Sequence, residues 1–143
     1  MTKHMTTNDC RVIELSRFHD GRGNLTFAEN NAQVPFEIKR AYWIYDVPAG
    51  ESRGAHAHRN LEQFIVAMSG SFRVTVDDGT CRRSFVLDRP DRGLYVSPGI
   101  WCELDGFSSG AVCMVLASEL FIEEDYICDY DEFIDEYSIP VTP

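Results

Sequence analysis

Short runs of alternating apolar and polar residues, separated by turn residues, occupy the chain from about residue 11 to residue 117. Phe72, Val74 and Val76 alternate with polar residues up to an Asp-Asp-Gly turn at 77–79, and the alternation resumes over 81–87. Because successive side chains of a strand point to opposite faces, this pattern predicts a hairpin. Strands this closely spaced leave no room for βαβ crossovers, so we expect an all-β sandwich or barrel.

A different pattern follows residue 118. Apolar residues recur at helical spacing among acidic ones, and these are Ile122, Tyr126, Tyr130, Phe133, Ile134 and Tyr137. We therefore expect an amphipathic α-helix over about 119–137, with its aromatic face packed on the barrel and Pro140 at its end. The length of 143 residues fits a single domain, 1–143, with a barrel over about 11–118.

The charge of the chain argues against a nucleic-acid partner. The formal net charge is -10, so a basic surface for phosphate backbones is not expected. Every Lys and Arg lies at or before Arg92, and the remaining residues carry only acidic charges. A small anionic ligand can therefore bind the first two thirds of the chain, where salt screens the acidic remainder.

The cysteines and the hydropathy of the chain argue against several other classes of protein. The 5 cysteines are odd in number and scattered, without a C-x-x-C pair, which excludes a disulfide framework and a zinc knuckle. No apolar run is long enough for a membrane span, and the polar start has no signal-peptide core. We expect a cytoplasmic protein with no membrane partner.

The most informative stretch for chemistry is Gly50 to His58, which contains Arg53 and an H-x-H pair. On a strand, His56 and His58 point to the same face, which in a barrel is the interior. Partial desolvation there lowers the pKa of an imidazole, so that both the neutral base and the protonated acid are accessible near neutral pH. The pair is thus a candidate for proton transfer.

The spacing resembles the first motif of the cupin superfamily, in which a glycine, an H-x-H pair, an acid and a second glycine follow at fixed intervals. Gly50, His56, His58 and Gly70 match, but Gln63 stands at the position of the acid. In principle His56, His58, Cys102 and Gln63 could hold a first-row metal. Neutral glutamine is a poor replacement for a carboxylate ligand, so we expect no metal.

Several strings together are similar to those of the cupin-type nucleotide-sugar 3,4-ketoisomerases that act on dTDP-4-keto-6-deoxyglucose, over nearly the whole chain. They are the Asp20 to Leu25 turn, the Ile38-Arg40-Tyr42 strand face, Arg53 to His58, Leu61 to Gln63, Trp101 with Glu103, and Val115 to Ser118. The resemblance implies a double-stranded β-helix (jelly-roll) barrel with a C-terminal helix. It also implies a homodimer with exchanged N-terminal strands and no metal.

The resemblance also implies a mechanism. Moving the ketone from C4 to C3 through an enediol involves no net redox change, so no cofactor is required. His56 would carry the proton between the carbons, while His58 and Tyr42 would act on the sugar oxygens. Arg40 and Arg53 would contact the pyrophosphate, since guanidinium binds it bidentately.

Four further residues are expected to contact substrate, and these are Arg22, Gln63, Cys102 and Glu103. Arg22 resembles the galacto-type members of the family and favours a galacto product. Cys102 matches neither the histidine nor the arginine expected at its position.

Three other functions stay open at the level of sequence. A dTDP-4-keto-6-deoxyglucose 3,5-epimerase abstracts a proton next to the same ketone, although such enzymes resemble H-x-Q or H-x-N where this chain has H-x-H. A metal-dependent cupin and a non-catalytic sugar-nucleotide-binding protein are the others.

Overall fold

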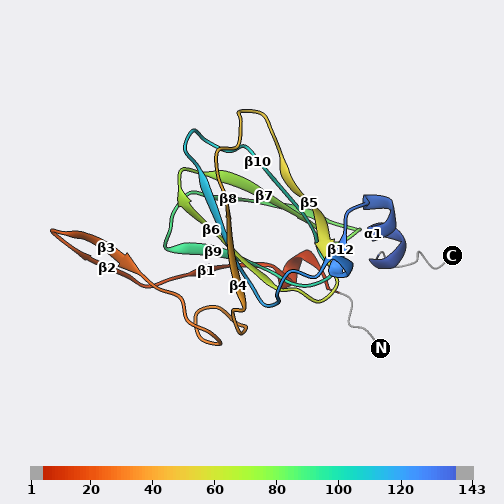
Figure 1. The fold of residues 1–143 in the computed structure, drawn as a ribbon, viewed down its shortest axis with the longest axis horizontal. Coiled ribbons are helices and arrows are strands. Elements are labelled where there is room, and N and C mark those ends of the chain that lie inside the picture. Colours follow the sequence, from red (N-terminus) through yellow and green to blue (C-terminus); the bar gives the residue numbers. More distant parts are fainter. Residues whose placement is uncertain (1–4, 138–143) are drawn as a thin grey trace.

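The structure is a computed structural model that describes residues 5–137 (Figure 1). It contains twelve strands, two short 3-10 helices and one α-helix within that range. In chain order these elements are η1 (Thr7–Asp9), β1 (Arg11–Glu14), β2 (Arg17–Asp20), β3 (Gly23–Thr26), β4 (Arg40–Ile44), β5 (Arg53–His58), β6 (Gln63–Ser69), β7 (Phe72–Asp77), β8 (Arg82–Leu87), β9 (Arg92–Val96), β10 (Trp101–Asp105), β11 (Val112–Ala117), η2 (Glu123–Asp125), β12 (Tyr126–Ile127) and α1 (Tyr130–Tyr137).

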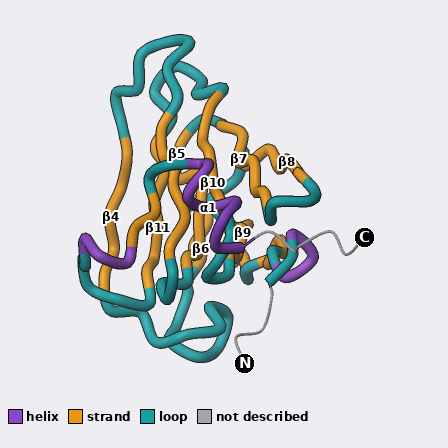
Figure 2. Tube along the Cα trace, turned by 90° about the vertical axis from the view of Figure 1, so that its right-hand side faces the viewer, coloured by secondary structure: helices purple, strands orange, loops and turns teal. Residues whose placement is uncertain are grey.

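Two five-stranded antiparallel sheets form the body of the protein. Their strand orders are β1-β9-β6-β11-β4 and β12-β5-β10-β7-β8. Figure 2 shows β4, β11 and β6 running next to one another in the first sheet. Inward-facing apolar side chains such as Ile65, Val74, Leu94 and Val115 fill the space between the sheets as the main core. The all-β, jelly-roll expectation is confirmed.

The predicted hairpin is present as β7 and β8, with Phe72 opposite Leu87 and Asp77 opposite Arg82. Its turn is held by Asp78, whose carboxylate accepts hydrogen bonds from the backbone amides of Thr80 (2.9 Å) and Cys81 (2.8 Å). A short side chain that bonds the backbone ahead of it is a common means of fixing a turn.

The C-terminal helix is shorter than the sequence suggested. It was expected over about 119–137, but α1 begins only at Tyr130. The preceding segment forms only the short 3-10 helix η2 and the strand β12, because Asp125 ties it to the loop after β5: its carboxylate accepts from the amides of Asn60 (2.8 Å) and Leu61 (3.2 Å). Tyr126 then pairs with His58 across β12 and β5, so helical spacing was misleading there.

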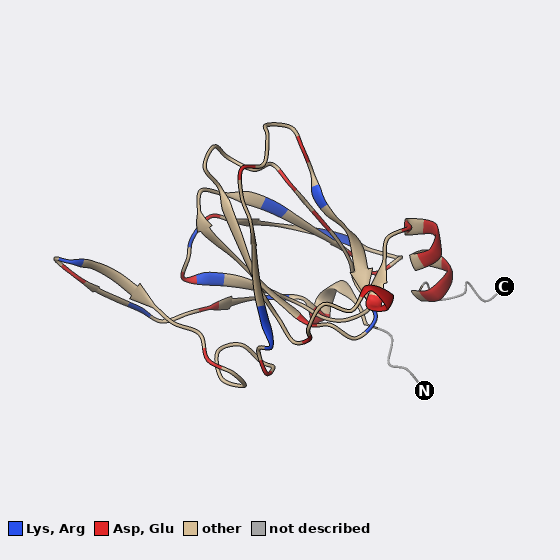
Figure 3. Ribbon diagram, viewed as in Figure 1, with Lys and Arg blue, Asp and Glu red and all other residues tan. Residues whose placement is uncertain are grey.

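The acidic residues of the C-terminal part gather on α1 and on η2 before it (Figure 3). The opposite, apolar side of α1 packs through Phe133 against Trp101 and Ile127. This arrangement agrees with the amphipathic pattern. None of the helices in residues 5–137 has the length and apolar character needed to cross a membrane.

The hairpin formed by β2 and β3 projects away from the two sheets (Figure 1). Phe18 and Leu25, which face one another across it, are 59% and 60% exposed. Large apolar side chains on an isolated two-stranded ribbon gain stability only when another surface covers them.

Candidate active site

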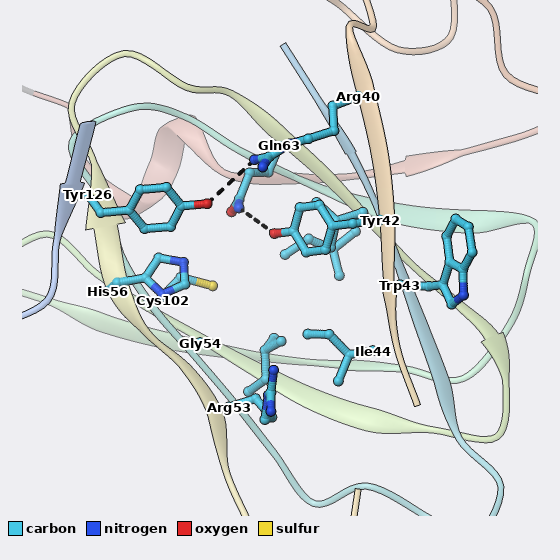
Figure 4. A pocket seen from close by; sticks show the side chains of 13 residues that line it. Arg40, Tyr42, Trp43, Ile44, Arg53, Gly54, His56, Gln63, Cys102 and Tyr126 are labelled. Carbon is cyan, nitrogen blue, oxygen red and sulfur yellow. Dashed lines mark hydrogen bonds between the residues drawn. The ribbon is translucent and has the colours of Figure 1, made fainter. Parts of the chain in front are cut away.

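A cavity of about 230 Å³ opens between the two sheets. Six strands contribute to it, and the lining residues are Arg40, Tyr42, Trp43, Ile44, Arg53, Gly54, His56, Gln63, Ile65, Cys102, Leu104, Val115 and Tyr126 (Figure 4). The structure thus brings together six of the nine residues that the sequence analysis singled out. Polar groups such as Arg40, His56 and Arg53 share the lining with apolar side chains, which is typical of a small-molecule site.

A β-bulge in β5 places Arg53 and His56 on the same face. Cys102 of β10 lies opposite His56, but Leu104 lies opposite Arg53, so β5 has one more residue than its partner in this interval. Gly54 takes a φ of 79° there, a left-handed conformation that glycine adopts without cost. In a regular strand, residues three apart point to opposite faces, so the bulge is what turns both side chains into the cavity.

The two imidazoles share a face, as predicted, with ring centroids 4.7 Å apart. Among the described residues, His56 lines the cavity while His58 lies behind it, 5% exposed and 4.3 Å from the ring of Tyr126. Burial lowers the pKa of His56. Burial, and then the nearby His56 and Arg40 charges, lower the pKa of His58 to about 3. Both rings are therefore neutral near pH 7, as a base must be.

Tyr42, on β4, presents its phenol to the same cavity. Gln63 Nε2 donates a hydrogen bond of 3.1 Å to the Tyr42 hydroxyl (Figure 4). Burial raises the pKa of Tyr42 above its ordinary value, so the phenol stays neutral and keeps a proton to donate. The Arg40 guanidinium lies 5.1 Å from the centre of the Tyr42 ring and supplies positive charge beside it.

Tyr126 is a cavity residue that the sequence analysis did not identify. Its ring lies 5.1 Å from that of His56, and its hydroxyl accepts a 3.5 Å hydrogen bond from Arg40 Nη2. The sequence placed it on a packing face of the expected helix. No local sequence pattern marked it, because its position depends on the pairing of β12 with β5.

Alternation along β10 separates two other predicted residues. The Cys102 side chain lines the cavity, and burial raises the pKa of its thiol far above the ordinary value. Glu103 points to the outer face, where it accepts from Trp101 Nε1 at 3.0 Å and lies 3.6 Å from Arg82. Glu103 therefore does not line this cavity, because neighbouring residues of a strand face opposite ways, and its expected substrate contact stays a prediction.

Arg22 lies in the turn of the β2–β3 hairpin rather than at the cavity of its own chain. Its side chain is 91% exposed and pairs with Asp20 at 2.7 Å. Gln63 is buried, but its visible partner is Tyr42.

The remaining candidates for chemistry are metal-binding groups and thiols. Within residues 5–137, no group of three or more His, Cys, Asp or Glu side chains is arranged to hold a metal ion. The cysteines are free: Cys10, Cys102 and Cys113 are buried, while Cys81 and Cys128 are exposed. Burial raises the pKa of Cys10 to about 11 and that of Cys113 to about 12.

Comparison with known families agrees with this geometry. A model of the FdtA family, described as "WxcM-like, C-terminal", matches residues 8–138. The chain belongs to this family. A curated relative from Aneurinibacillus thermoaerophilus, named TDP-4-oxo-6-deoxy-alpha-D-glucose-3,4-oxoisomerase, is 48% identical over 123 residues, which cover 86% of this chain and 88% of the relative.

Solved structures give the same result for this FdtA-family chain. The WlaRB TDP-quinovose 3,4-ketoisomerase from Campylobacter jejuni is 46% identical, with a TM-score of 0.85 over 89% of this chain and 98% of that one. The QdtA sugar 3,4-ketoisomerase from Thermoanaerobacterium thermosaccharolyticum, solved in complex with TDP, is 36% identical, with a TM-score of 0.90 over 92% and 96%.

Proposed function

We propose that this FdtA-family protein is a sugar-nucleotide 3,4-ketoisomerase that converts TDP-4-oxo-6-deoxyglucose into its 3-oxo isomer. The observation that carries the proposal is the meeting of His56 with Tyr42 in one cavity, beside Arg40 and Arg53. A neutral base, a neutral phenol and two cations are the groups that an enediol pathway on an anionic sugar requires. The named activity of the 48% identical relative supports the same assignment.

His56 carries the carbon-bound proton. As a neutral imidazole it accepts the proton from C3, which leaves the enediol, and it returns that proton to C4. The ring begins and ends the cycle neutral. Its lowered pKa keeps it in the accepting form near pH 7.

Tyr42 transfers protons to and from the sugar oxygens at C4 and C3. It donates its phenol proton to the C4 carbonyl oxygen as the C3 proton leaves, and it regains a proton from the C3 hydroxyl as the ketone forms there. The C4 oxygen thus gains one proton, the C3 oxygen loses one, and Tyr42 is restored. His58, behind His56, supports that ring rather than reaching the sugar.

Arg40 and Arg53 bind the diphosphate. Both line the cavity from different strands, and guanidinium suits the bidentate geometry of phosphate oxygens. The TDP complex of the Thermoanaerobacterium relative supports a TDP-sugar as the substrate. Gln63 and Cys102 complete the wall around the hexose.

We also propose a homodimer with exchanged N-terminal strands, in which Arg22 reaches the pocket of the partner subunit. The projection of the β2–β3 hairpin and the exposure of Phe18 and Leu25 support this arrangement, because a second subunit would cover these side chains (Figure 1). Light scattering coupled to size exclusion should give twice the chain mass. A monomer that turns over substrate at full rate would contradict it.

The function is tested by incubating the protein with TDP-4-oxo-6-deoxyglucose in D₂O and following the product by NMR. The proposal expects a 3-oxo sugar, which carries deuterium at C4 wherever the proton held on His56 exchanges with solvent before it is returned. Deuterium at C3 and C5 with the ketone still at C4 would identify a 3,5-epimerase instead. The C4 configuration is read in the same spectrum, and Arg22 leads us to expect the galacto form.

Two control measurements address the remaining alternatives. Stoichiometric iron or zinc in untagged protein, measured by elemental analysis, would favour a metal-dependent cupin. Tight binding of TDP without any turnover would favour a sugar-nucleotide sensor.

A further inference from the structure

Gln63 occupies the position at which the cupin motif has an acid, and its side chain is 4% exposed. It lies on β6, while Tyr42 lies on β4, with β11 between them in the sheet. The amide reaches past β11 to donate its 3.1 Å hydrogen bond to the phenol oxygen (Figure 4). This buried amide therefore contacts a side chain that is proposed to transfer protons.

The hydrogen-bonding capacity of a phenol limits the directions in which the Tyr42 proton can point. A tyrosine hydroxyl has one proton to donate and lone pairs that accept. Because the amide N–H of Gln63 uses a lone pair, the Tyr42 proton cannot point at Gln63. Arg40, 5.1 Å from the ring centre, carries only donors and cannot accept the proton either. No other hydrogen bond of the Tyr42 hydroxyl forms within residues 5–137, so the proton is left for a group inside the cavity.

We propose that Gln63 is a positioning residue that fixes the hydrogen-bond direction of Tyr42, so that the phenol donates to the sugar oxygen and not to the protein. This inference rests on the proposed function and assigns a role within the same site. It also explains the departure from the acid of the cupin motif. A carboxylate only accepts, and it would take the phenol proton for itself.

The decisive variant is Gln63→Glu, which keeps the side-chain shape and reverses the polarity of the hydrogen bond. With substrate at about pH 8, above the ordinary histidine pKa of about 6.5, His56 stays neutral. We expect kcat to fall about 100-fold, the loss typical of removing one donor to a developing oxyanion. KM should change less than about 3-fold, since the change acts on the transition state. Gln63→Met removes the bond without reversing it, and about a 10-fold loss is expected.

A double-mutant cycle with Tyr42→Phe separates this role from a general effect of the new charge on His56 or the diphosphate. Without the phenol, Gln63→Glu should lower kcat by less than about 3-fold, because residues acting through one another are not additive. Thermal denaturation of each variant shows whether it is folded. If Gln63→Glu does not fold, the cycle is run with Gln63→Met.

The outcomes distinguish this inference from the proposed function. Failure of the unsubstituted enzyme to turn over TDP-4-oxo-6-deoxyglucose would overturn both. If that enzyme is active, a folded Gln63→Glu variant with an unchanged kcat would overturn the role of Gln63 alone. So would an equal loss of kcat on the Tyr42 and the Tyr42→Phe backgrounds.

Discussion

The left-handed glycine in β5 gives a direct test of how the site is positioned. Gly54→Ala adds a side chain where φ is 79°, inside the bulge between Arg53 and His56. Gly50→Ala is a matched control, because Gly50 has a similar φ of 84° but lies in the turn before β5, where an added Cβ meets nothing within 4 Å.

The cost of each substitution follows from the backbone. A left-handed conformation costs an alanine about 1–2 kcal/mol, so both variants should lose about that much free energy of unfolding. For a chain of this size, that loss lowers Tm by roughly 3–8 °C. The added Cβ at position 54 lies 3.4 Å from Leu104 Cγ, an ordinary contact, so packing adds little.

The two variants should differ in activity. The strand can relieve the strain at position 54 by straightening the bulge, and this turns Arg53 or His56 away from the cavity. A displacement of about 1 Å costs about 100-fold in rate, so kcat/KM of Gly54→Ala should fall by about that factor while Gly50→Ala stays close to the unsubstituted enzyme. Calorimetry and the NMR turnover assay measure both quantities. Equal activity of the two variants would refute the role given to the bulge.

The histidines give three further predictions. His56→Asn should lower kcat by about 10²- to 10⁴-fold while calorimetric TDP affinity and Tm stay within error; a parallel loss of binding and stability would mark a structural residue. Because burial lowers the pKa of His56, kcat/KM should rise with pH through a midpoint below the ordinary value of about 6.5, and a midpoint above it would contradict the assignment. Burial lowers the pKa of His58 to about 3, so between about pH 3 and pH 6.5 the unfolded state alone binds this proton. The contribution of His58 to stability is therefore constant above about pH 6.5 and falls as the pH drops towards about 3, and denaturant titrations should show a shallower fall for His58→Asn; identical profiles would count against the buried neutral ring.

Period-two alternation predicted the hairpin of β7 and β8 and the shared face of His56 and His58, because both depend only on local strand geometry. It could not predict that His58 lies behind His56. That arrangement depends on Tyr126, which returns from the far end of the chain to pair with β5.

The errors have equally specific causes. Ile122, Tyr126 and Tyr130 recur every four residues, which is typical of a helix, but Asp125 binds the amides of Asn60 and Leu61, and the segment forms a single 3-10 turn and a short strand instead of an α-helix. The substrate contact of Glu103, expected by resemblance, stays a prediction, and the alternation along β10 turns its side chain away from this cavity. Regular alternation would also have turned Arg53 away from His56, and the single extra residue at the bulge reverses this.

The distribution of the thiols has a practical consequence. The sulfur next to the proposed sugar site, on Cys102, is buried and resists ionisation, and alkylating reagents attack the thiolate. A maleimide fluorophore should therefore couple at the exposed Cys81 and Cys128 and leave the cavity unmodified. The enzyme can thus be tethered to a surface or dyed for microscopy without first removing any of its native cysteines.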